Sequence, residues 1–193
     1  QSLSASRPLS GAGSAEEARM RVLDLCCGEP GGWAEGFLAA GYEVIGIDIN
    51  PCPNYPGQFI QADIRSLDVR PFQGTEVIVA SPPCAEFSRH DQPWTRKHNP
   101  PPPDMSIVEA CLRIKQKLRP RFFVLENVRG AQKWLGKAII RRGSFYLWGD
   151  VALAPAIAHR FKETYSSRQR AERAKVPFDL AYGLAMVFRG SGD

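Results

Sequence analysis

The sequence lacks any apolar stretch long enough to cross a bilayer, which excludes a membrane-spanning helix within these 193 residues. It also lacks a C-x-x-C spacing; its 5 cysteines are odd in number, and its 3 histidines form no paired-ligand motif. We therefore expect neither a disulfide framework nor a zinc site. We expect the cysteines to be reduced thiols in an intracellular protein. This length supports one buried core and is too short for two domains with separate cores.

Residues 1–19 lack an apolar run and are rich in Ser, Ala and Gly. A signal peptide needs a continuous apolar segment, and a packed core needs more apolar surface than this stretch offers. We interpret residues 1–19 as a disordered tail, or as an added remnant ahead of a natural start at Met20. Residues 20–193 are then a single domain.

Charge is distributed unevenly along the chain. Residues 1–84 hold 5 Lys+Arg and 10 Asp+Glu, a net charge of −5, whereas residues 85–193 hold 20 and 10, a net charge of +10. A basic half beside an acidic half favours a rim that meets a polyanion such as nucleic acid. Solvated helix faces are the alternative explanation.

Short apolar runs alternate with helical patterns. We expect strands at 20–26, 42–48, 58–63, 75–80, 121–128 and 145–148, and helices at 33–40, 106–118 and 177–188. Ser106 and Glu109 have the spacing of a capping box, and an apolar stripe follows from Ile107 to Leu118. The alternation predicts an α/β fold with a mostly parallel, doubly wound sheet, helices on both faces, and ligands beyond the carboxyl ends of the strands.

Residues 85–103 show no periodicity and end in four consecutive prolines. A loop of this length inside a compact domain is typical of a functional lid or binding element. We expect it to be a mobile loop over the site.

A glycine-rich turn, Asp24-Leu-Cys-Cys-Gly28-Glu-Pro-Gly31-Gly32, lies between a predicted strand and a predicted helix. In this context the backbone can approach a nucleotide-like ligand. Acids end the next two strands, where Asp48 can accept hydrogen bonds from ribose hydroxyls and Asp63 can accept one from an exocyclic amine. Each of these pieces alone also fits ordinary turn glycines and exposed loop acids.

Two further motifs follow predicted strands: Ser81-Pro-Pro-Cys84 and Glu126-Asn127-Val128. Together with the glycine turn and the strand-end acids, in this order, they resemble the cytosine-C5 DNA methyltransferases, and the short chain suits a compact, phage-type or otherwise minimal branch of that family. The resemblance implies a Rossmann-like, S-adenosylmethionine-dependent methyltransferase fold, with S-adenosyl-L-methionine as the cofactor and double-stranded DNA as the substrate.

The chemistry of this family explains why these residue types occur together. Carbon 5 of cytosine is a poor nucleophile, so a thiolate must first add to C6 while N3 is protonated or hydrogen-bonded. The resemblance assigns the attack to Cys84 and the contact with N3 to Glu126, while Asn127 would position the junction of strand and loop. Glu126 then needs a raised pKa in a pocket of low dielectric constant.

The resemblance also implies two sets of binding residues. The cofactor would be bound by the turn, the strand ends and the segment before the nucleophile: Asp24, Cys26, Gly28, Gly31, Gly32, Asp48, Ile49, Asp63, Ile64, Ser81 and Pro82. The 85–103 loop would enclose a flipped cytosine. Contacts to DNA would come from this loop and from an echo of the family's Gln-x-Arg-x-Arg motif: Ser88, Arg89, Trp94, Arg96, Lys97, Arg168 and Arg170.

The chain departs from the family pattern at several positions. Glu29-Pro30 adds a residue to the turn, Ala85 replaces the customary glutamine, and Ser81 replaces a glycine. A separate target-recognition domain is missing between the last two motifs. We therefore expect a recognition site of very few base pairs, read by residues 85–103, 129–142 and 160–175.

Three alternatives stay open at this point. The chain is an RNA cytosine-C5 methyltransferase acting on tRNA, a catalytically silent subunit that binds the cofactor or DNA for a partner, or an enzyme that transfers a modified one-carbon group. For the main hypothesis we expect a monomer without a metal, in the cytoplasm of a bacterium or a phage-infected host cell.

Overall fold

The computed structural model describes residues 19–29, 31–93, 100–151 and 175–191. The expected tail, apart from Arg19, lies outside these ranges, as do the predicted DNA contacts Trp94, Arg96, Lys97, Arg168 and Arg170. In the described part of the chain, no helix combines the length and the apolar character that crossing a membrane requires.

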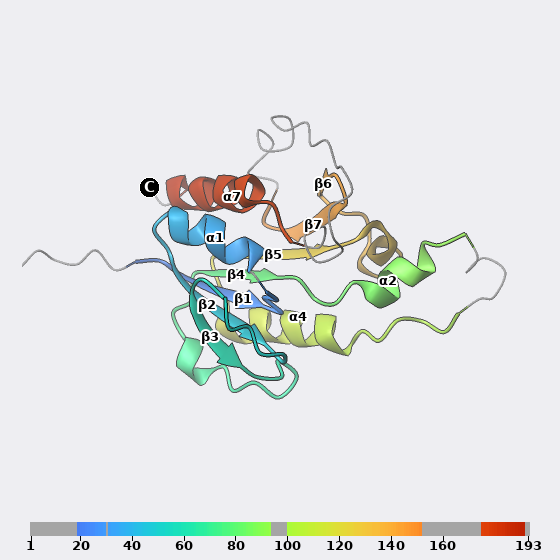
Figure 1. Cartoon of the computed structure of the whole chain (residues 1–193), viewed down its shortest axis with the longest axis horizontal. Helices are drawn as coiled ribbons and strands as arrows, with labels where there is room; N and C mark the ends of the chain where they lie inside the picture. Colours follow the sequence, from blue (N-terminus) through green and yellow to red (C-terminus); the bar gives the residue numbers. More distant parts are fainter. Residues whose placement is uncertain (1–18, 30, 94–99, 152–174, 192–193) are drawn as a thin grey trace, which may run out of the picture.

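Within these ranges the centre of the molecule is a seven-stranded sheet in the order β3-β2-β1-β4-β5-β7-β6 (Figure 1). Strands β1 to β5 pair in parallel, and β7 runs antiparallel to both of its neighbours, β5 and β6. The predicted fold class is confirmed, whereas β6 was not predicted. The bounds are Arg21–Leu25 for β1, Glu43–Asp48 for β2, Gln58–Gln61 for β3, Val77–Ala80 for β4, Phe122–Asn127 for β5, Ile140–Arg142 for β6 and Phe145–Gly149 for β7.

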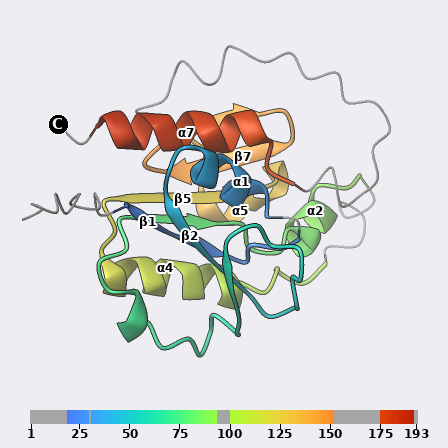
Figure 2. The same ribbon diagram turned by 60° about the vertical axis from the view of Figure 1, so that its left-hand side comes forward.

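Helices cover both faces of this sheet (Figures 1 and 2). Helices α1 (Gly32–Ala39) and α7 (Phe178–Gly190) pack together on one face, and α4 (Ser106–Leu118) lies on the other. Shorter elements follow the strand ends: the helices α2 (Ala85–His90) and α5 (Gln132–Leu135), and the 3-10 turns η1 (Arg70–Phe72) and η2 (Arg129–Ala131).

The two helix layers meet alternate side chains of the strands. Val22 of β1 packs into the cluster that contains Phe37 of α1, whereas its neighbour Leu23 packs into the cluster that contains Ile114 of α4. Successive strand residues point to opposite faces, and parallel strands covered on both sides are apolar throughout. This is why the strand motifs read as unbroken apolar runs.

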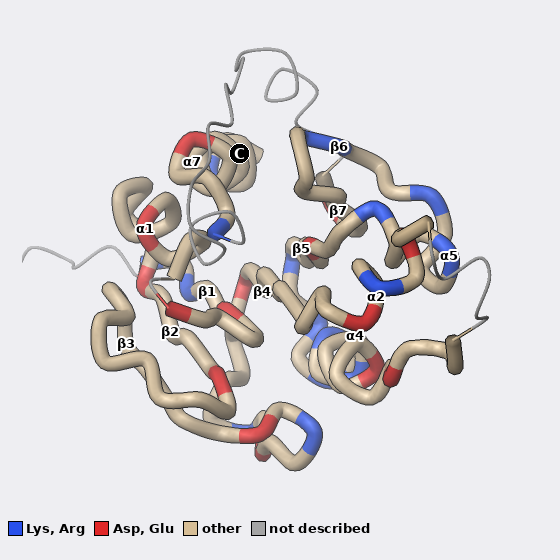
Figure 3. Tube along the Cα trace, turned by 45° about the vertical axis from the view of Figure 1, so that its right-hand side comes forward, with Lys and Arg blue, Asp and Glu red and all other residues tan. Residues whose placement is uncertain are grey.

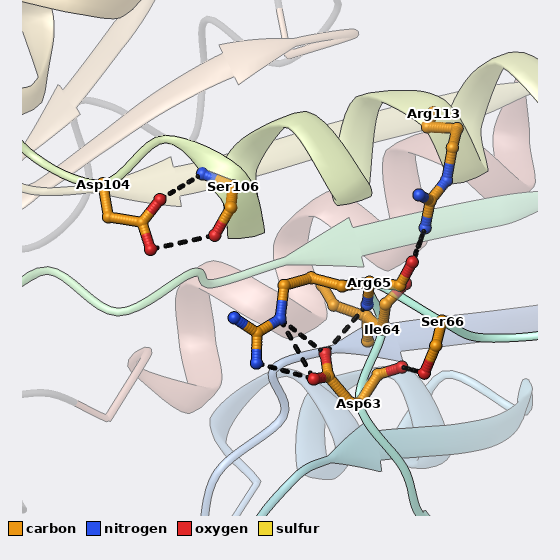
Figure 4. A network of polar contacts seen from close by, with 7 residues as sticks. All are labelled: Asp63, Ile64, Arg65, Ser66, Asp104, Ser106 and Arg113. Carbon is orange, nitrogen blue, oxygen red and sulfur yellow. Dashed lines mark hydrogen bonds and ion pairs between the residues drawn. The ribbon is translucent and has the colours of Figure 1, made fainter.

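Two local expectations were wrong. The 85–103 segment begins with α2, because Phe87 is buried against Trp134 of α5, a contact that local periodicity does not reveal. The capping box at the start of α4 does not form. The N-cap is Met105, without a side-chain cap, and Asp104 before it accepts hydrogen bonds from the Ser106 N–H at 2.8 Å and from its hydroxyl at 2.9 Å (Figure 4).

Removing Phe188 should destabilise the fold. Its ring is fully buried and stacks on Phe122 of β5, with centroids 4.3 Å apart. Because Phe188→Ala leaves a cavity, we expect a loss of about 3–5 kcal/mol in the free energy of unfolding, measured by urea denaturation. Met186→Ala, on the same helix but 46% exposed, is the control and should cost less than about 1 kcal/mol. Equal losses in the two variants would contradict this account of the core.

Candidate active site

The two predicted catalytic motifs meet because β4 and β5 are neighbouring parallel strands. The register pairs Ala80 with Leu125, so the residues that follow them leave the sheet at the same edge. The buried amide of Asn127 donates to the carbonyl oxygen of Pro82 at 2.9 Å, and its oxygen accepts from the Val128 N–H at 2.9 Å. Asn127 therefore ties the segment before Cys84 to the segment that carries Glu126.

A pocket of about 900 Å³ lies at this edge, within the size range of small-molecule sites. Cys84 and Glu126 both line it. Other predicted site residues in the lining are Cys26, Gly28, Gly31, Gly32, Ser81 and Pro82 from the cofactor set and Ser88 from the DNA set. One pocket thus brings together the glycine turn and the two groups assigned to the chemistry.

The carboxyl group of Glu126 is buried at the end of β5. Burial raises its pKa from 4.5 to about 7, and a hydrogen bond with the Ser81 side chain partly opposes this rise. A group with a pKa near neutrality can both give and take a proton under cellular conditions.

Cys84 directly precedes α2, and contacts with α5 and η2 hold this helix in place. Beyond the Phe87–Trp134 contact, Arg129 of η2 forms an ion pair with Asp91 at 2.8 Å. The approach is close, because a Cβ on Gly130 would lie 2.1 Å from the carbonyl oxygen of Phe87. The segment that carries Cys84 is therefore docked on the segment that follows β5.

Glycine occupies each of the three positions of the turn for a different physical reason. Gly28 has φ 58°, and nothing lies within 4 Å of the position where a Cβ would stand, so the backbone there faces open space. A Cβ on Gly31 would lie 2.7 Å from the Tyr55 ring, and one on Gly32 would lie 2.6 Å from the Val176 backbone. Packing therefore explains Gly32, packing and a left-handed backbone (φ 72°) together explain Gly31, and Gly28 leaves room for a ligand.

Two carboxyl groups lie at the turn. Oδ2 of the fully buried Asp24 accepts a hydrogen bond from the Tyr55 hydroxyl at 3.0 Å, and Oδ1 has no partner among the described residues. Burial raises the pKa of Asp24 to about 8; the Tyr55 hydrogen bond opposes this rise and Asp48 adds to it. Asp48 itself accepts from the Gly28 N–H at 3.1 Å and from the Asn50 N–H at 2.9 Å.

Several predicted residues lie outside the described pocket lining. The carboxylate of Asp63 pairs with Arg65 at 2.6 Å (Figure 4), which holds its pKa below the usual value. Ile64 is buried in the cluster on the α4 side, Ile49 is 55% exposed, and Arg89 is exposed on α2.

The pocket lining also contains residues that the sequence did not single out. Trp33 of α1 donates to the Ser81 hydroxyl at 2.9 Å, and Lys175 reaches the pocket while pairing with Glu35 at 2.7 Å. Arg141 of β6 was signalled only by the basic stretch 129–142. The remaining unpredicted lining residues are Cys27, Glu29, Pro83, Val128, Gly143, Ser144, Phe145 and Val176.

Basic residues gather on one side of this pocket. Figure 3 shows Lys and Arg on α2, α5 and β6. These elements follow β4 and β5, so part of the positive charge of the second half of the chain lies beside the predicted catalytic groups.

Three further groups cluster beside the turn. Cys27, Asp48 and Cys52 bring their ligand atoms within 4.8 Å of one another in the described part of the chain. The sequence gave no C-x-x-C signal for this cluster, because its members come from separate segments. Asp48 already accepts hydrogen bonds there, and the Cys52 thiol contacts the Asn50 carbonyl oxygen at 3.6 Å.

The chain has a Rossmann-like α/β fold, with a parallel sheet extended by the antiparallel β7, and its glycine turn opens on the pocket. The family model described as C-5 cytosine-specific DNA methylase matches residues 20–137, more than half of the chain. The chain belongs to the C-5 cytosine-specific DNA methylase family. The resemblance seen in the sequence is confirmed.

Similar proteins include two bacterial Type II methyltransferases. M.AgeI of Thalassovita gelatinovora is 28% identical over 63% of this chain and 30% of its own length, and M.FnuDI of Fusobacterium nucleatum is 29% identical over 58% and 33%. Among solved structures, the S. pombe Dnmt2 methyltransferase is 24% identical, with a TM-score of 0.41 over 60% of this chain and 38% of its own. The chain spans about a third of the length of the curated relatives it matches.

Replacing Asp24 should change how stability depends on pH. Because its pKa is raised from 3.8 to about 8, the folded protein keeps a proton that the unfolded chain loses. This group therefore lowers the free energy of unfolding as pH rises from about 4 to about 8, by at most about 1.4 kcal/mol per pH unit. In urea denaturation, the stability of Asp24→Asn relative to wild type should increase from about pH 5 to about pH 8.

Asp68→Asn is the control for this measurement, because Asp68 is a surface carboxylate whose pKa is lowered by Arg70. Its effect on stability should stay constant between the same two pH values, since the group is ionised in both states there. A constant difference for Asp24→Asn as well would show that Asp24 does not hold the extra proton.

Proposed function

We propose that this chain carries the catalytic centre of a DNA (cytosine-5)-methyltransferase. The observation that carries the proposal is one pocket lined by the glycine turn, by Cys84 and by a buried Glu126 with a pKa near neutrality. Family membership supports a cytosine ring as the group that enters between them.

S-adenosyl-L-methionine is the cofactor we propose for this pocket. The residues present fit it: Gly28 faces open space, the Asp48 carboxylate lies beside the Gly28 N–H, and the buried Oδ1 of Asp24 lacks a partner among the described residues. The turn and Asp48 would hold the nucleoside part. The ion pair of Asp63 with Arg65 would have to open before Asp63 could contact an amine, which costs little at the surface. When bound, the cofactor supplies an electrophilic methyl group.

Cys84 and Glu126 have complementary roles in this reaction. The Cys84 thiolate forms a bond to C6 of a flipped cytosine, the electrons of the C5–C6 double bond move into the ring, and Glu126 donates a proton to N3. C5 would then be nucleophilic and would take the methyl group, with the sulfur–methyl bond of the sulfonium breaking to leave a neutral thioether. After a base removes the C5 proton, the thiolate leaves C6 and Glu126 recovers its proton. The docked α2 and the clamp made by Asn127 hold the two groups at one edge.

The basic side of the pocket is where we propose that DNA binds. Arg141 and Ser88 line the pocket, and Arg89 is exposed on the neighbouring α2. Arginine side chains that contact phosphates neutralise them without reading the base sequence. Because so few groups near the pocket can contact bases, we predict a short recognition site. We also predict a monomeric enzyme that acts inside a bacterial or phage-infected cell.

Cys84→Ser should abolish methylation. The test is base-resolution sequencing of 5-methylcytosine in plasmid DNA from cells that express the protein, because it reports activity, base and sequence context together. Wild type should also form a covalent adduct with duplex DNA containing 5-fluorocytosine, and Cys84→Ser should not. Cys111→Ala, in the buried face of α4, is the control and should keep both signals.

The same assay separates the alternatives. Methyl transfer to tRNA but not to duplex DNA would replace DNA with RNA as the substrate, and mass spectrometry of the product base would reveal a modified one-carbon group. Cofactor binding without transfer or adduct would identify a silent subunit. Methylation that persists in Cys84→Ser would overturn the mechanism.

Arg141→Ala should weaken DNA binding. Arg141 is exposed beside the pocket, with its guanidinium 5.6 Å from the centre of the Tyr146 ring. Loss of one phosphate contact should lower affinity similarly for all sequences and reduce the salt slope of binding by about 1, measured by fluorescence anisotropy. Arg70→Ala is the control, since Arg70 lies on η1, 88% exposed and paired with Asp68. Unchanged binding by Arg141→Ala would place the DNA elsewhere.

A further inference from the structure

Ser81 lies between two buried side chains at the pocket. The indole N–H of Trp33 donates to Ser81 Oγ at 2.9 Å, and the Ser81 side chain is hydrogen-bonded to Glu126. Trp33 is 2% exposed and packs beside Phe37 of α1, with ring centroids 6.4 Å apart. The three polar groups come from α1, the end of β4 and the end of β5, so the sheet and the helix layer set their arrangement.

The chemistry of these groups gives the chain of hydrogen bonds a direction. An indole N–H can only donate, and a serine hydroxyl has one proton to give. The Trp33 N–H occupies one of the two lone pairs of Ser81 Oγ, which leaves the serine proton and one lone pair for the Glu126 carboxyl group. Trp33 therefore favours Ser81 as a donor toward Glu126, in line with the lowering effect of Ser81 on the Glu126 pKa.

We infer that Ser81 and Trp33 are positioning residues for Glu126, holding one carboxyl oxygen so that the other is presented to N3 of the cytosine. This inference rests on the proposed function and deepens it. Ser81 can donate to Glu126 in both of its protonation states, because a protonated carboxyl group keeps an oxygen that accepts. The same contact can thus persist while the second oxygen gives a proton to N3 and recovers it.

The two hydrogen bonds from Trp33 to Ser81 and from Ser81 to Glu126, which we call the relay, also affect the balance between the neutral and the charged form of Glu126. Burial alone favours the neutral acid, and a donor to the carboxylate favours the charged form. Other titratable groups along the pocket are Cys26, Cys27, Glu29, Cys84, Arg141 and Lys175, but burial and Ser81 are the causes resolved for the pKa of Glu126. Without Trp33, the serine hydroxyl can rotate and accept from the neutral acid, which removes the bias toward the carboxylate.

The sequence suggested a different role for Ser81, as a cofactor contact, and the test separates the two. The Glu126 titration is followed directly by carboxyl-carbon NMR of protein labelled with 13C at the glutamate side chain, with the Glu126 signal identified by its loss in Glu126→Gln. Ser81→Ala should move the titration midpoint to higher pH by about one unit. Trp33→Phe should move it in the same direction by less, and Ser81→Thr, which keeps a hydroxyl, should restore it.

Ser144→Ala is the matched control, because it removes another hydroxyl from the pocket lining and leaves the Ser81–Glu126 contact in place. Its Glu126 titration should match wild type. Thermal unfolding checks that each variant is folded. If Trp33→Phe does not fold, Ser81→Ala still tests whether Ser81 sets the Glu126 titration, because this variant removes only one oxygen atom.

Methyl-transfer kinetics provide the second readout. In Ser81→Ala, kcat should fall and its pH profile should move with the Glu126 titration, while the Kd for S-adenosyl-L-methionine stays within about twofold of wild type. An unmoved titration combined with weaker cofactor binding would overturn the inference and leave Ser81 as a cofactor contact. A titration that moves as expected in a protein without any methyl transfer would keep the relay and refute the proposed function instead.

Discussion

The parallel pairing of β4 with β5 is the constraint on which the site depends. Parallel neighbours in register end at the same edge of the sheet, so the residues after Ala80 and after Leu125 must meet there. The side chain of Asn127 then closes the junction on Pro82, across 45 residues of sequence. Pro82 and Pro83 prevent the chain from continuing β4, and the segment that carries Cys84 leaves the sheet and lines the pocket.

Burial at this edge raises the pKa of two carboxyl groups to values near neutral pH. Asp24 and Glu126 are both buried, and burial raises both pKa values by disfavouring the charged form. Retaining such groups costs stability, because the unfolded chain would ionise them freely. Among the described residues, Asp24 contacts the hydroxyl of Tyr55 and Glu126 contacts the hydroxyl of Ser81, and neither carboxyl group is paired with a cation. Groups of this kind are typical of functional sites.

The local sequence pattern was enough to predict most strands and the long helices. It failed for elements whose position depends on contacts between residues far apart in the sequence. The apolar runs predicted six of the strands and the three long helices, because burial on both faces of a parallel sheet demands unbroken apolar segments. The local pattern missed α2, whose anchor is Phe87 against Trp134, and it predicted a capping box at the start of α4, where Ser106 is instead hydrogen-bonded to Asp104. β6 is only a short edge strand, too short to give a periodic signal.

The sequence by itself determined the order of the motifs, the α/β class and the pair formed by Cys84 and Glu126, since these depend on residue type and on position relative to the strands. Only the tertiary structure decided what surrounds them. Trp33 reaches Ser81 across 48 residues, and Asp63 turns to its neighbour Arg65 and not to the pocket. The reason is physical: side-chain partners are selected by packing in three dimensions, and spacing along the chain carries no record of that packing.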